Sequence, residues 1–354
     1  MTVPNGRRSR LSPMTSNSAS RGADRSPRDS VVLPRVTLVA CGGTIATVPT
    51  AEAVLQRTAS ELLTSVEAID TLATLDTRDV IGKPSHLMTL DDISAVADAA
   101  CDAAGQAGTD GVVVTHGTDI LEEVAYLTDL WHDGEAPIVF TGAQRNAASP
   151  DGDGPGNIRD SIRVAASPAA RGIGVLLCFA GQVFSAVRVR KVDTISLHAF
   201  DALGDVLGRI SSGEVRLYAR HDRPAAIRPR RLAHGVHLVR LCAAADGTLV
   251  DAAVTAGAQA IIVETFGAGT APAEVVDAVA AASAAGVLVA FVSRCERGGL
   301  WSQPGRGGFD DLVGAGAVPM QDLDGGKARM RLLALLGARD ANAAQVRAEL
   351  LQER

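Results

Sequence analysis

The chain has 354 residues, of which 47% are hydrophobic, 3% are aromatic and 21% are charged, and its formal net charge is -6. This composition is typical of a globular enzyme or binding protein and excludes a fibrous or largely disordered chain. The negative charge and the scarcity of aromatic rings argue against nucleic acid as a partner. No run of about 18 uncharged apolar residues occurs, so we expect no membrane-spanning segment.

Residues 1–30 are rich in arginine and serine and lack the continuous apolar stretch of a secretory signal. We expect them to form a disordered extension, although a transit peptide, or an overlong gene start with Met14 as the internal candidate, would have the same composition. The five cysteines contain no C-x-x-C pair and lie mostly in apolar runs. This pattern favours neither disulfides nor a zinc site, and it fits a reducing, cytoplasmic compartment.

From Pro34 onward, short β-rich runs alternate with longer helical patterns, which is typical of βαβ units and a parallel sheet. The first strand is predicted over 36–40. Thr89 then provides an N-cap for a helix whose apolar residues, from Ile93 to Ala104, recur at helical spacing. Further along, the pattern predicts strands over 111–115, 138–141 and 174–179, and helices over 120–131 and 157–166.

A charged, irregular stretch with Pro224 and Pro229 separates this unit from a second one. The chain is long enough for two domains, each with its own core. We predict an α/β fold with a larger N-terminal catalytic domain over 31–212, built on a doubly wound, mostly parallel sheet, then a linker over 213–234 and a smaller C-terminal α/β domain over 235–354. The second domain is predicted to contain strands over 236–241, 260–264 and 287–292 and helices over 273–284, 327–336 and 342–352.

Two short motifs each place a threonine hydroxyl where a predicted strand opens into a turn. Their sequences are C-G-G-T-I-A at 41–46 and T-H-G-T-D at 115–119. Because open α/β sheets bind ligands at the carboxyl ends of their strands, the hydroxyls of Thr44 and Thr118 are candidate nucleophiles. A threonine hydroxyl is a weak nucleophile at neutral pH, so it needs a nearby base and a site for the oxyanion that it generates.

Asp119 and Lys191 are candidates for that support. The Asp119 carboxylate is suited to bind a cation, such as a substrate ammonium group, or to steady a lysine. Lys191 lies among arginines, and burial beside other cations would lower the pKa of its amine and favour the neutral form that accepts a proton. Each feature also has a plainer interpretation, since Gly42 and Gly43 alone indicate only a tight turn and Lys191 alone indicates a solvated charge.

Two other polar motifs are interpreted as structural. The loop 151–156 resembles both a calcium loop and a G-x-G-x-x-G fingerprint, but Pro155 stands at a ligand position and no strand precedes the loop. His116 precedes a turn at the end of an apolar strand, and we expect a hydrogen-bonded structural histidine there.

Together, the motifs resemble those of the bacterial L-asparaginase (asparaginase/glutaminase) family, cytoplasmic type. The family signatures are T-G-G-T-I-A near the start and H-G-T-D-T further into the same domain, and this chain departs from them only at Cys41 and Ile120. The resemblance extends from about Val36 to Leu351. It includes T-G-A at 141–143, D-G-P-G-N at 153–157 and K-V-D-T at 191–194.

The resemblance implies an amidohydrolase that converts L-asparagine into L-aspartate and ammonia through an acyl-enzyme. It implies that Thr44 is the nucleophile that attacks the side-chain amide. Thr118, Lys191 and Asp119 then correspond to the family's Thr-Lys-Asp triad. In that triad Thr118 relays the proton and positions water, Lys191 tunes it, and Asp119 also holds the α-ammonium group of the substrate.

The resemblance also implies the substrate contacts and the assembly. Ser85 corresponds to the serine that binds the α-carboxylate, His86 stands where many relatives carry a substrate-binding glutamine, and Ala143 corresponds to a backbone contact with the leaving amide. No metal or organic cofactor is implied. Because the family's active site lies between the first domain of one subunit and the second domain of another, a homodimer or homotetramer is implied.

One departure from the family pattern concerns the loop after Thr44. Many family members carry a tyrosine in this loop, which hydrogen-bonds the nucleophile and is steadied by a glutamate of a neighbouring subunit. Here the segment 48–58 contains no tyrosine, and the segment 301–309 contains no acid. We therefore expect weaker or differently tuned activity. The alternatives are a glutaminase, a relative that acts on a transfer-RNA-linked amide, and a catalytically weak homologue that binds aspartate or asparagine.

Overall fold

The computed structural model describes residues 32–49, 54–202, 205–220, 223 and 225–352. The predicted extension at 1–30 lies outside the described residues. Contacts within the chain separate Met1–Val32 from Leu33–Arg354, and all the elements below belong to the second of these units.

The N-terminal part is built on an eight-stranded sheet with the order β12-β11-β8-β7-β6-β5-β1-β4. The parallel strands are β4 (Thr74–Asp79), β1 (Arg35–Ala40), β5 (Gly111–Thr115), β6 (Ile138–Thr141) and β7 (Val175–Phe179). Antiparallel pairing adds β8 (Gln182–Ser185), β11 (Val206–Ser211) and β12 (Glu214–Leu217). Every residue of β5, with the sequence GVVVT, is buried, as expected for a parallel strand covered on both faces.

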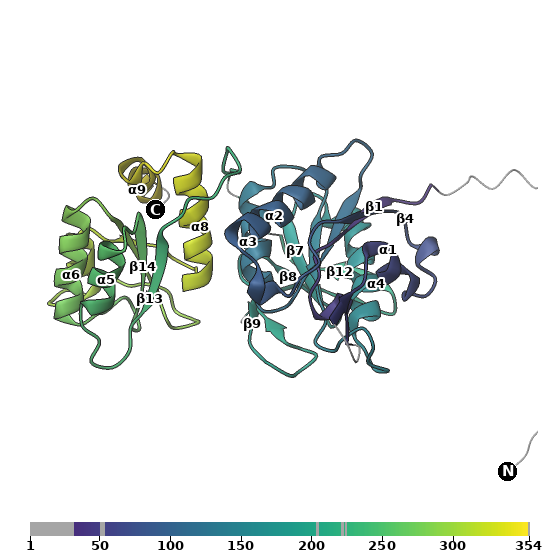
Figure 1. Ribbon diagram of the computed structural model, residues 1–354, viewed down its shortest axis with the longest axis horizontal. Helices are drawn as coiled ribbons and strands as arrows, with labels where there is room; N and C mark the ends of the chain where they lie inside the picture. Colours follow the sequence, from purple (N-terminus) through teal and green to yellow (C-terminus); the bar gives the residue numbers. More distant parts are fainter. Residues whose placement is uncertain (1–31, 50–53, 203–204, 221–222, 224, 353–354) are drawn as a thin grey trace, which may run out of the picture. The chain divides into compact units, whose positions relative to one another are not determined.

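Helices cover both faces of this sheet (Figure 1). Alternate residues of β1 divide between two apolar clusters, with Leu38 in one and Val39 in the other. The Val39 cluster includes residues of α2 (Leu90–Ala104) and α3 (Leu121–Trp131), and the Leu38 cluster includes residues of α1 (Ala59–Thr64) and α4 (Gly154–Ala165). Thr89 caps α2 in a reciprocal capping box with Asp92, which confirms the predicted N-cap.

Short elements fill the connections of the N-terminal part. The hairpin strands β2 (Thr47–Pro49) and β3 (Val54–Gln56) pair antiparallel, as do β9 (Arg190–Lys191) and β10 (Phe200–Asp201). The 3-10 turns are η1 (Thr44–Ala46), η2 (Ile69–Thr71), η3 (Ser85–Leu87) and η4 (Pro168–Ala170). Two of these turns, η1 and η3, carry predicted site residues.

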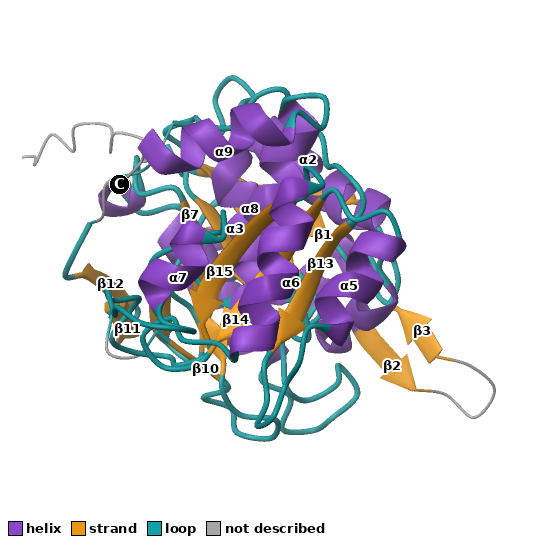
Figure 2. Cartoon of the chain, turned by 90° about the vertical axis from the view of Figure 1, so that its left-hand side faces the viewer, coloured by secondary structure: helices purple, strands orange, loops and turns teal. Residues whose placement is uncertain are grey.

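The C-terminal part contains a parallel sheet with the order β13-β14-β15-β16, of which Figure 2 labels β13, β14 and β15. Its strands are β13 (Val236–Arg240), β14 (Ala260–Thr265), β15 (Leu288–Ser293) and β16 (Val318–Pro319). Residues of α5 (Thr248–Thr255), α6 (Ala273–Ala284) and α7 (Phe309–Gly314) form a cluster with one face. The other face packs on α8 (Gly325–Ala338) and α9 (Ala343–Gln352), and α8 also packs against α3.

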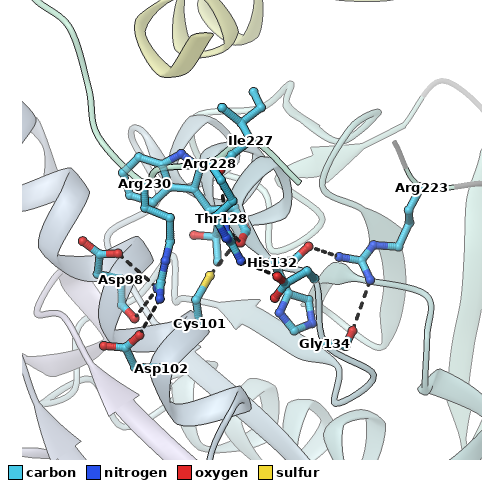
Figure 3. Close-up of polar contacts among 12 residues, drawn as sticks. Asp98, Cys101, Asp102, Thr128, His132, Gly134, Arg223, Ile227, Arg228 and Arg230 are labelled. Carbon is cyan, nitrogen blue, oxygen red and sulfur yellow. Dashed lines mark hydrogen bonds and ion pairs between the residues drawn. The ribbon is translucent and has the colours of Figure 1, made fainter. Parts of the chain in front are cut away.

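Arginines of the segment between the two sheets bind to α2, to the end of α3 and to the loop that follows α3 (Figure 3). Arg230 lies 3.1 Å from Asp98 and 2.8 Å from Asp102, both on α2. Arg228 donates to the Trp131 carbonyl at 2.5 Å, and Arg223 donates to the Gly134 carbonyl at 3.2 Å. These arginines are therefore held by charged hydrogen bonds, although the sequence around them is irregular.

The predicted α/β fold with two domains and a mostly parallel first sheet is confirmed, but several short strands were not predicted. In particular, the predicted linker at 213–234 begins with β12, which is hydrogen-bonded to β11 at the edge of the first sheet. β12 has the sequence EVRL, and the two charged residues of this edge strand are exposed. Charged residues are tolerated on the exposed side of an edge strand, so the sheet extends to Leu217.

Candidate active site

The turn after β1 lies directly against the turn after β5. The two strands are parallel neighbours, and Ala40 is in register with Thr115. Gly43 has φ 86° and ψ -179°, a conformation open to glycine alone. A Cβ atom on Gly43 would lie 2.3 Å from the backbone nitrogen of Gly117. The two predicted motifs therefore meet backbone to backbone at these two glycines.

Thr44 opens η1 immediately after Gly43, at the carboxyl end of β1, and is partly exposed. The turn is fixed by hydrogen bonds to the Gly43 carbonyl, which accepts from the Ala46 backbone at 3.0 Å and from the Thr47 hydroxyl at 2.8 Å. Gln56 of β3 donates in turn to the Thr47 hydroxyl at 2.8 Å. The nucleophile candidate is thus presented on a rigid turn.

Thr118, Asp119 and Lys191 form a directly connected group. Lys191 Nζ donates to Thr118 Oγ1 at 2.7 Å and lies 3.4 Å from Asp119 Oδ1. Thr118 is 6% exposed, whereas about half of the Asp119 side chain, 55%, is open to solvent. A buried hydroxyl that contacts an ammonium group can pass a proton along the contact, and the exposed carboxylate is free to bind a second cation.

The cations expected beside Lys191 have other partners, so that part of the prediction is wrong. Arg188 lies 3.3 Å from Asp205 and 3.2 Å from Asp322. Arg190 lies 3.8 Å from Asp324. The reason is that successive side chains of an extended segment point in opposite directions, so sequence neighbours of Lys191 do not share its surroundings.

Ser85 and His86 lie beside the same turn. A Cβ atom on Gly117 would lie 2.5 Å from Ser85 Oγ, so this side chain packs on the Gly117 backbone. Ser85 is 2% exposed, and among the described residues its hydroxyl has no hydrogen-bond partner. His86 is exposed, and its Nδ1 lies 3.5 Å from Asp119 Oδ2. A buried hydroxyl without a partner inside the chain is suited to a ligand, because burial of an unpaired polar group is unfavourable.

Ala143 lies on the loop after β6, directly after Gly142, which faces the Thr118 side chain. A Cβ atom on Gly142 would be 3.0 Å from Thr118 Cγ2. Asp153 holds this loop, because its carboxylate accepts from the backbone N–H groups of Gln144 at 3.0 Å and Arg145 at 2.9 Å. The loop 151–156, predicted to be a structural turn, therefore also shapes the site.

Asn157 adds a second support to the loop after β6. Its side-chain amide donates to the Gly142 carbonyl at 3.0 Å, and its Oδ1 accepts from the Ala180 backbone at 3.0 Å. Neither Asp153 nor Asn157 was predicted as a site residue. Their place in the D-G-P-G-N motif at 153–157 was the available signal.

His116 is confirmed as a hydrogen-bonded histidine at the end of β5. It is fully buried, and its Nδ1 donates to the Gly117 carbonyl at 2.8 Å, which fixes the tautomer with the proton on Nδ1. Burial lowers the pKa of this imidazole to about 4. The ring is therefore neutral at physiological pH.

The structure gathers the predicted site residues around Gly117. Thr44 approaches through Gly43, Ser85 packs on Gly117 itself, and the remaining residues connect through Thr118 and Asp119. Glu122 was missed, although its carboxylate accepts from the backbone N–H of Lys191. That contact joins residues 69 positions apart, so no local sequence pattern indicates it.

Neither a metal cluster nor a membrane span is found in the described part of the chain. No three or more histidine, cysteine, aspartate or glutamate side chains within it could hold a metal ion together. None of the helices it contains is both long and apolar enough to cross a bilayer.

Comparisons with known proteins agree with the motifs. The family model described as Asparaginase, N-terminal matches residues 35–223, and the model described as Glutaminase/Asparaginase C-terminal domain matches residues 235–349. A protein of Deinococcus radiodurans named Probable L-asparaginase is 33% identical over 310 residues, which are 86% of this chain and 93% of that protein. The L-asparaginase of Bacillus licheniformis is 34% identical over 233 residues, 65% of this chain and 72% of that protein.

Among solved structures, a probable cytoplasmic L-asparaginase from Campylobacter jejuni has a similar fold. The TM-score is 0.78 at 24% sequence identity, and the match covers 90% of this chain and 99% of that one. At this identity the likeness bears on the fold alone.

Proposed function

The chain belongs to the asparaginase family of amidohydrolases, and from that premise we propose that it hydrolyses L-asparagine to L-aspartate and ammonia in the cytoplasm, with Thr44 as the nucleophile. The observation that carries the proposal is the 2.7 Å contact between Lys191 Nζ and Thr118 Oγ1, in a turn that touches the turn of Thr44. A turn with only a structural role does not require a contact with a lysine that lies 73 residues further along the chain.

In the acylation step, Thr44 Oγ attacks the carbon of the side-chain amide. The bond between Oγ and this carbon forms, the carbon–nitrogen bond breaks, and the hydroxyl proton ends on the leaving nitrogen to give ammonia. Backbone N–H groups in the turns after β1 and β5 stabilise the oxyanion between these events. The product of the step is an ester between Thr44 and the β-carboxyl group of aspartate.

In the second step, water attacks the ester carbon and the bond to Thr44 Oγ breaks. Thr118 holds this water, and its hydroxyl relays the water proton along its hydrogen bond with Lys191. The water proton finally returns to Thr44 Oγ and regenerates the hydroxyl. The route uses only side chains and water, so the proposal includes no metal or organic cofactor.

Recognition of the amino acid falls to the groups around Asp119. Its exposed carboxylate takes the α-ammonium group of the substrate, and the Ser85 hydroxyl, which has no hydrogen-bond partner among the described residues, donates to the α-carboxylate. His86 supplies a second polar contact beside Asp119, and the Ala143 backbone contacts the leaving amide. A homodimer or homotetramer in which a second subunit completes the site is part of the proposal.

L-glutamine is the nearest alternative substrate. One methylene changes transition-state binding by only about 1–3 kcal/mol, so the same residues would serve either amide. A transfer-RNA-linked amide would additionally need a basic docking surface, and the net charge of -6 does not favour one. A homologue that binds aspartate or asparagine without turnover is the alternative outside enzymes.

One paired experiment decides among these functions. Ammonia release from L-asparagine and L-glutamine is measured in a coupled assay, and aspartate binding is measured by calorimetry on the same preparation. We expect ammonia release with a higher kcat/KM for L-asparagine. Binding heat without ammonia would instead identify a non-catalytic homologue, and a higher kcat/KM for L-glutamine would identify a glutaminase.

A further inference from the structure

The backbone of Lys191 is held from outside its own strand. β9 and its partner β10 are two residues each, so strand pairing supports Lys191 only weakly. The Lys191 backbone N–H donates to Oε2 of Glu122, in the first turn of α3. Its Nζ donates to Thr118, four residues before Glu122. The backbone N–H and the side-chain Nζ of Lys191 therefore both donate to one short segment, 118–122.

A second helix, α8, binds the residue that directly precedes β9. The Val189 carbonyl accepts from Nζ of Lys327 in α8, and Lys327 is only 1% exposed. Asp324, the N-cap of α8, lies 3.6 Å from Lys327 Nζ and 3.8 Å from Arg190 Nε. Residues 189–191 are thus each held by a different charged group. Lys327 binds the carbonyl of Val189, and Asp324 lies beside the guanidinium of Arg190. Glu122 accepts from the backbone N–H of Lys191.

Two charged groups of this network, Glu122 and Lys327, lie in poorly solvated positions. Burial raises the pKa of Glu122 to about 7 and lowers the pKa of Lys327. Lys327, Asp324 and Arg190 are the charged groups that act on Glu122, and its carboxylate also accepts from Lys191. Buried ion networks add little net stability compared with apolar side chains of similar volume, and their best-supported use is to select one arrangement. Here the network selects the position of the backbone at residues 189–191.

We propose that Glu122 and Lys327 are positioning residues for the reaction: from α3 and α8 they hold the backbone of residues 189–191 so that Lys191 Nζ stays at Thr118 Oγ1. The inference rests on the proposed function, in which Lys191 serves Thr118. It also gives the C-terminal part of the chain a role in its own N-terminal site, because Lys327 belongs to α8.

Substitutions at Glu122 test one end of this network in the full-length chain. Glu122→Ala removes the acceptor for the Lys191 N–H, whereas Glu122→Gln keeps an oxygen in the same place. We expect Glu122→Ala to lower kcat for ammonia release roughly 10- to 100-fold, because a small misplacement of a catalytic group has effects of that size. KM should stay within about threefold, because the substrate contacts are unchanged, and Glu122→Gln should restore kcat to within about threefold of the parent.

Glu123→Ala is the matched control. Burial also raises the pKa of Glu123, but its carboxyl lies beside Gly326 of α8, where a Cβ atom would be 3.1 Å from it. Removal of this neighbouring carboxylate should leave kcat within about twofold of the parent, since it does not hold β9. A comparable loss of kcat in Glu123→Ala would indicate general disturbance of α3 and overturn the positioning role of Glu122.

Lys327→Met tests the other end. Methionine fills a similar volume but leaves Asp324 and the Val189 carbonyl without this partner, so the free energy of unfolding should decrease, and kcat of the folded variant should fall roughly tenfold. A purely structural lysine would give the same loss of stability but an unchanged kcat in the folded variant.

Parent-like kcat in folded Glu122→Ala or in folded Lys327→Met overturns the inference. An inactive parent chain is a different result, because it contradicts the proposed function itself. The two failures are therefore distinguished by the parent protein alone.

Discussion

Two polar regions of the chain use their charges in different ways. In the segment that joins the two sheets, each guanidinium of Arg223, Arg228 and Arg230 contacts at least two oxygen atoms of the chain itself (Figure 3). At the ends of β1 and β5, the described residues leave Ser85 Oγ and His116 Nε2 buried without a hydrogen bond. Among the described residues, Arg223 Nε and Trp131 Nε1 are also buried without a hydrogen bond, so such atoms alone do not separate the two regions. The difference lies in the charged groups: the guanidinium groups bind oxygen atoms of the chain itself, whereas about half of the Asp119 side chain is open to solvent beside the buried Ser85 hydroxyl.

The largest contrast is expected from removing one cation in each region. Lys191→Met should lower kcat roughly 10³-fold, because proton transfer at Thr118 loses its partner. Arg230→Met should leave kcat unchanged and lower the free energy of unfolding by about 1 kcal/mol, the scale of a part-exposed ion pair. Ammonia assays and urea unfolding of both variants measure the four quantities. Equal effects of the two substitutions on kcat would remove the distinction between the regions.

Two glycines with nearly equal φ angles give the next contrast. Gly43→Ala forces a Cβ atom to 2.3 Å from Gly117, and we expect a loss of at least about 3 kcal/mol in the free energy of unfolding. Gly108 has φ +84° and open space around its Cα, so Gly108→Ala should lose only about 1 kcal/mol, from backbone strain. Chemical unfolding decides, and a Gly43→Ala protein as stable as Gly108→Ala would show that the two turns do not touch.

Each region also contains a buried histidine whose pKa burial lowers to about 4, His116 at the strand end and His132 beside the arginine segment. Their unfolded-state pKa is about 6.5, so unfolding binds protons and stability is full above pH 6.5. It is lost as the pH falls from 6.5 through 4, by up to about 3 kcal/mol for each ring. Urea unfolding across this range checks the sign, and increasing stability on acidification would contradict it.

Burial is the largest cause of both pKa shifts, but the further causes differ. For His132, the Arg223 guanidinium lowers the pKa further, whereas no charged group contributes to the shift of His116. Arg223→Met should therefore raise the pKa of His132 and leave the pKa of His116 unchanged in an NMR titration. Parallel shifts of both rings would show that the substitution acts through global loosening.

The smallest contrast concerns two buried hydroxyls. Ser85→Ala should raise KM about tenfold through the lost hydrogen bond to a charged substrate group, with stability almost unchanged. Thr128 donates to the Val124 carbonyl at 2.8 Å, so Thr128→Val should lower the free energy of unfolding by about 1 kcal/mol and leave KM unchanged. If Ser85→Ala instead lost stability at constant KM, the serine would be a structural group like Thr128.

The sequence predicted the buried parallel strands and capped helices well. The continuous apolar run of β5 and the Thr89 cap of α2 are local signals, and both elements form where they were predicted. β9 and β12 were missed because two to four residues carry no usable periodicity and because their side chains are partly exposed. Pairing with distant strands, rather than local pattern, makes these segments extended.

The same limit applies to the candidate site. Thr44, Thr118, Asp119 and Lys191 were predicted from motifs, and their roles stay predictions. Glu122 and Asp153 were missed because their contacts with Lys191 and with the loop after β6 depend on tertiary structure. Motifs therefore identified the groups that we propose to meet the substrate, whereas the groups that hold them in place became visible only in three dimensions.

Ammonia release by Thr44→Ala and Thr44→Ser, compared with the parent chain, tests the central claim most directly. Serine keeps a hydroxyl at the end of β1, so Thr44→Ser should retain measurable turnover of L-asparagine, while Thr44→Ala should fall to background with an unchanged unfolding transition. Turnover by folded Thr44→Ala within tenfold of the parent would contradict the assignment of this oxygen as the nucleophile.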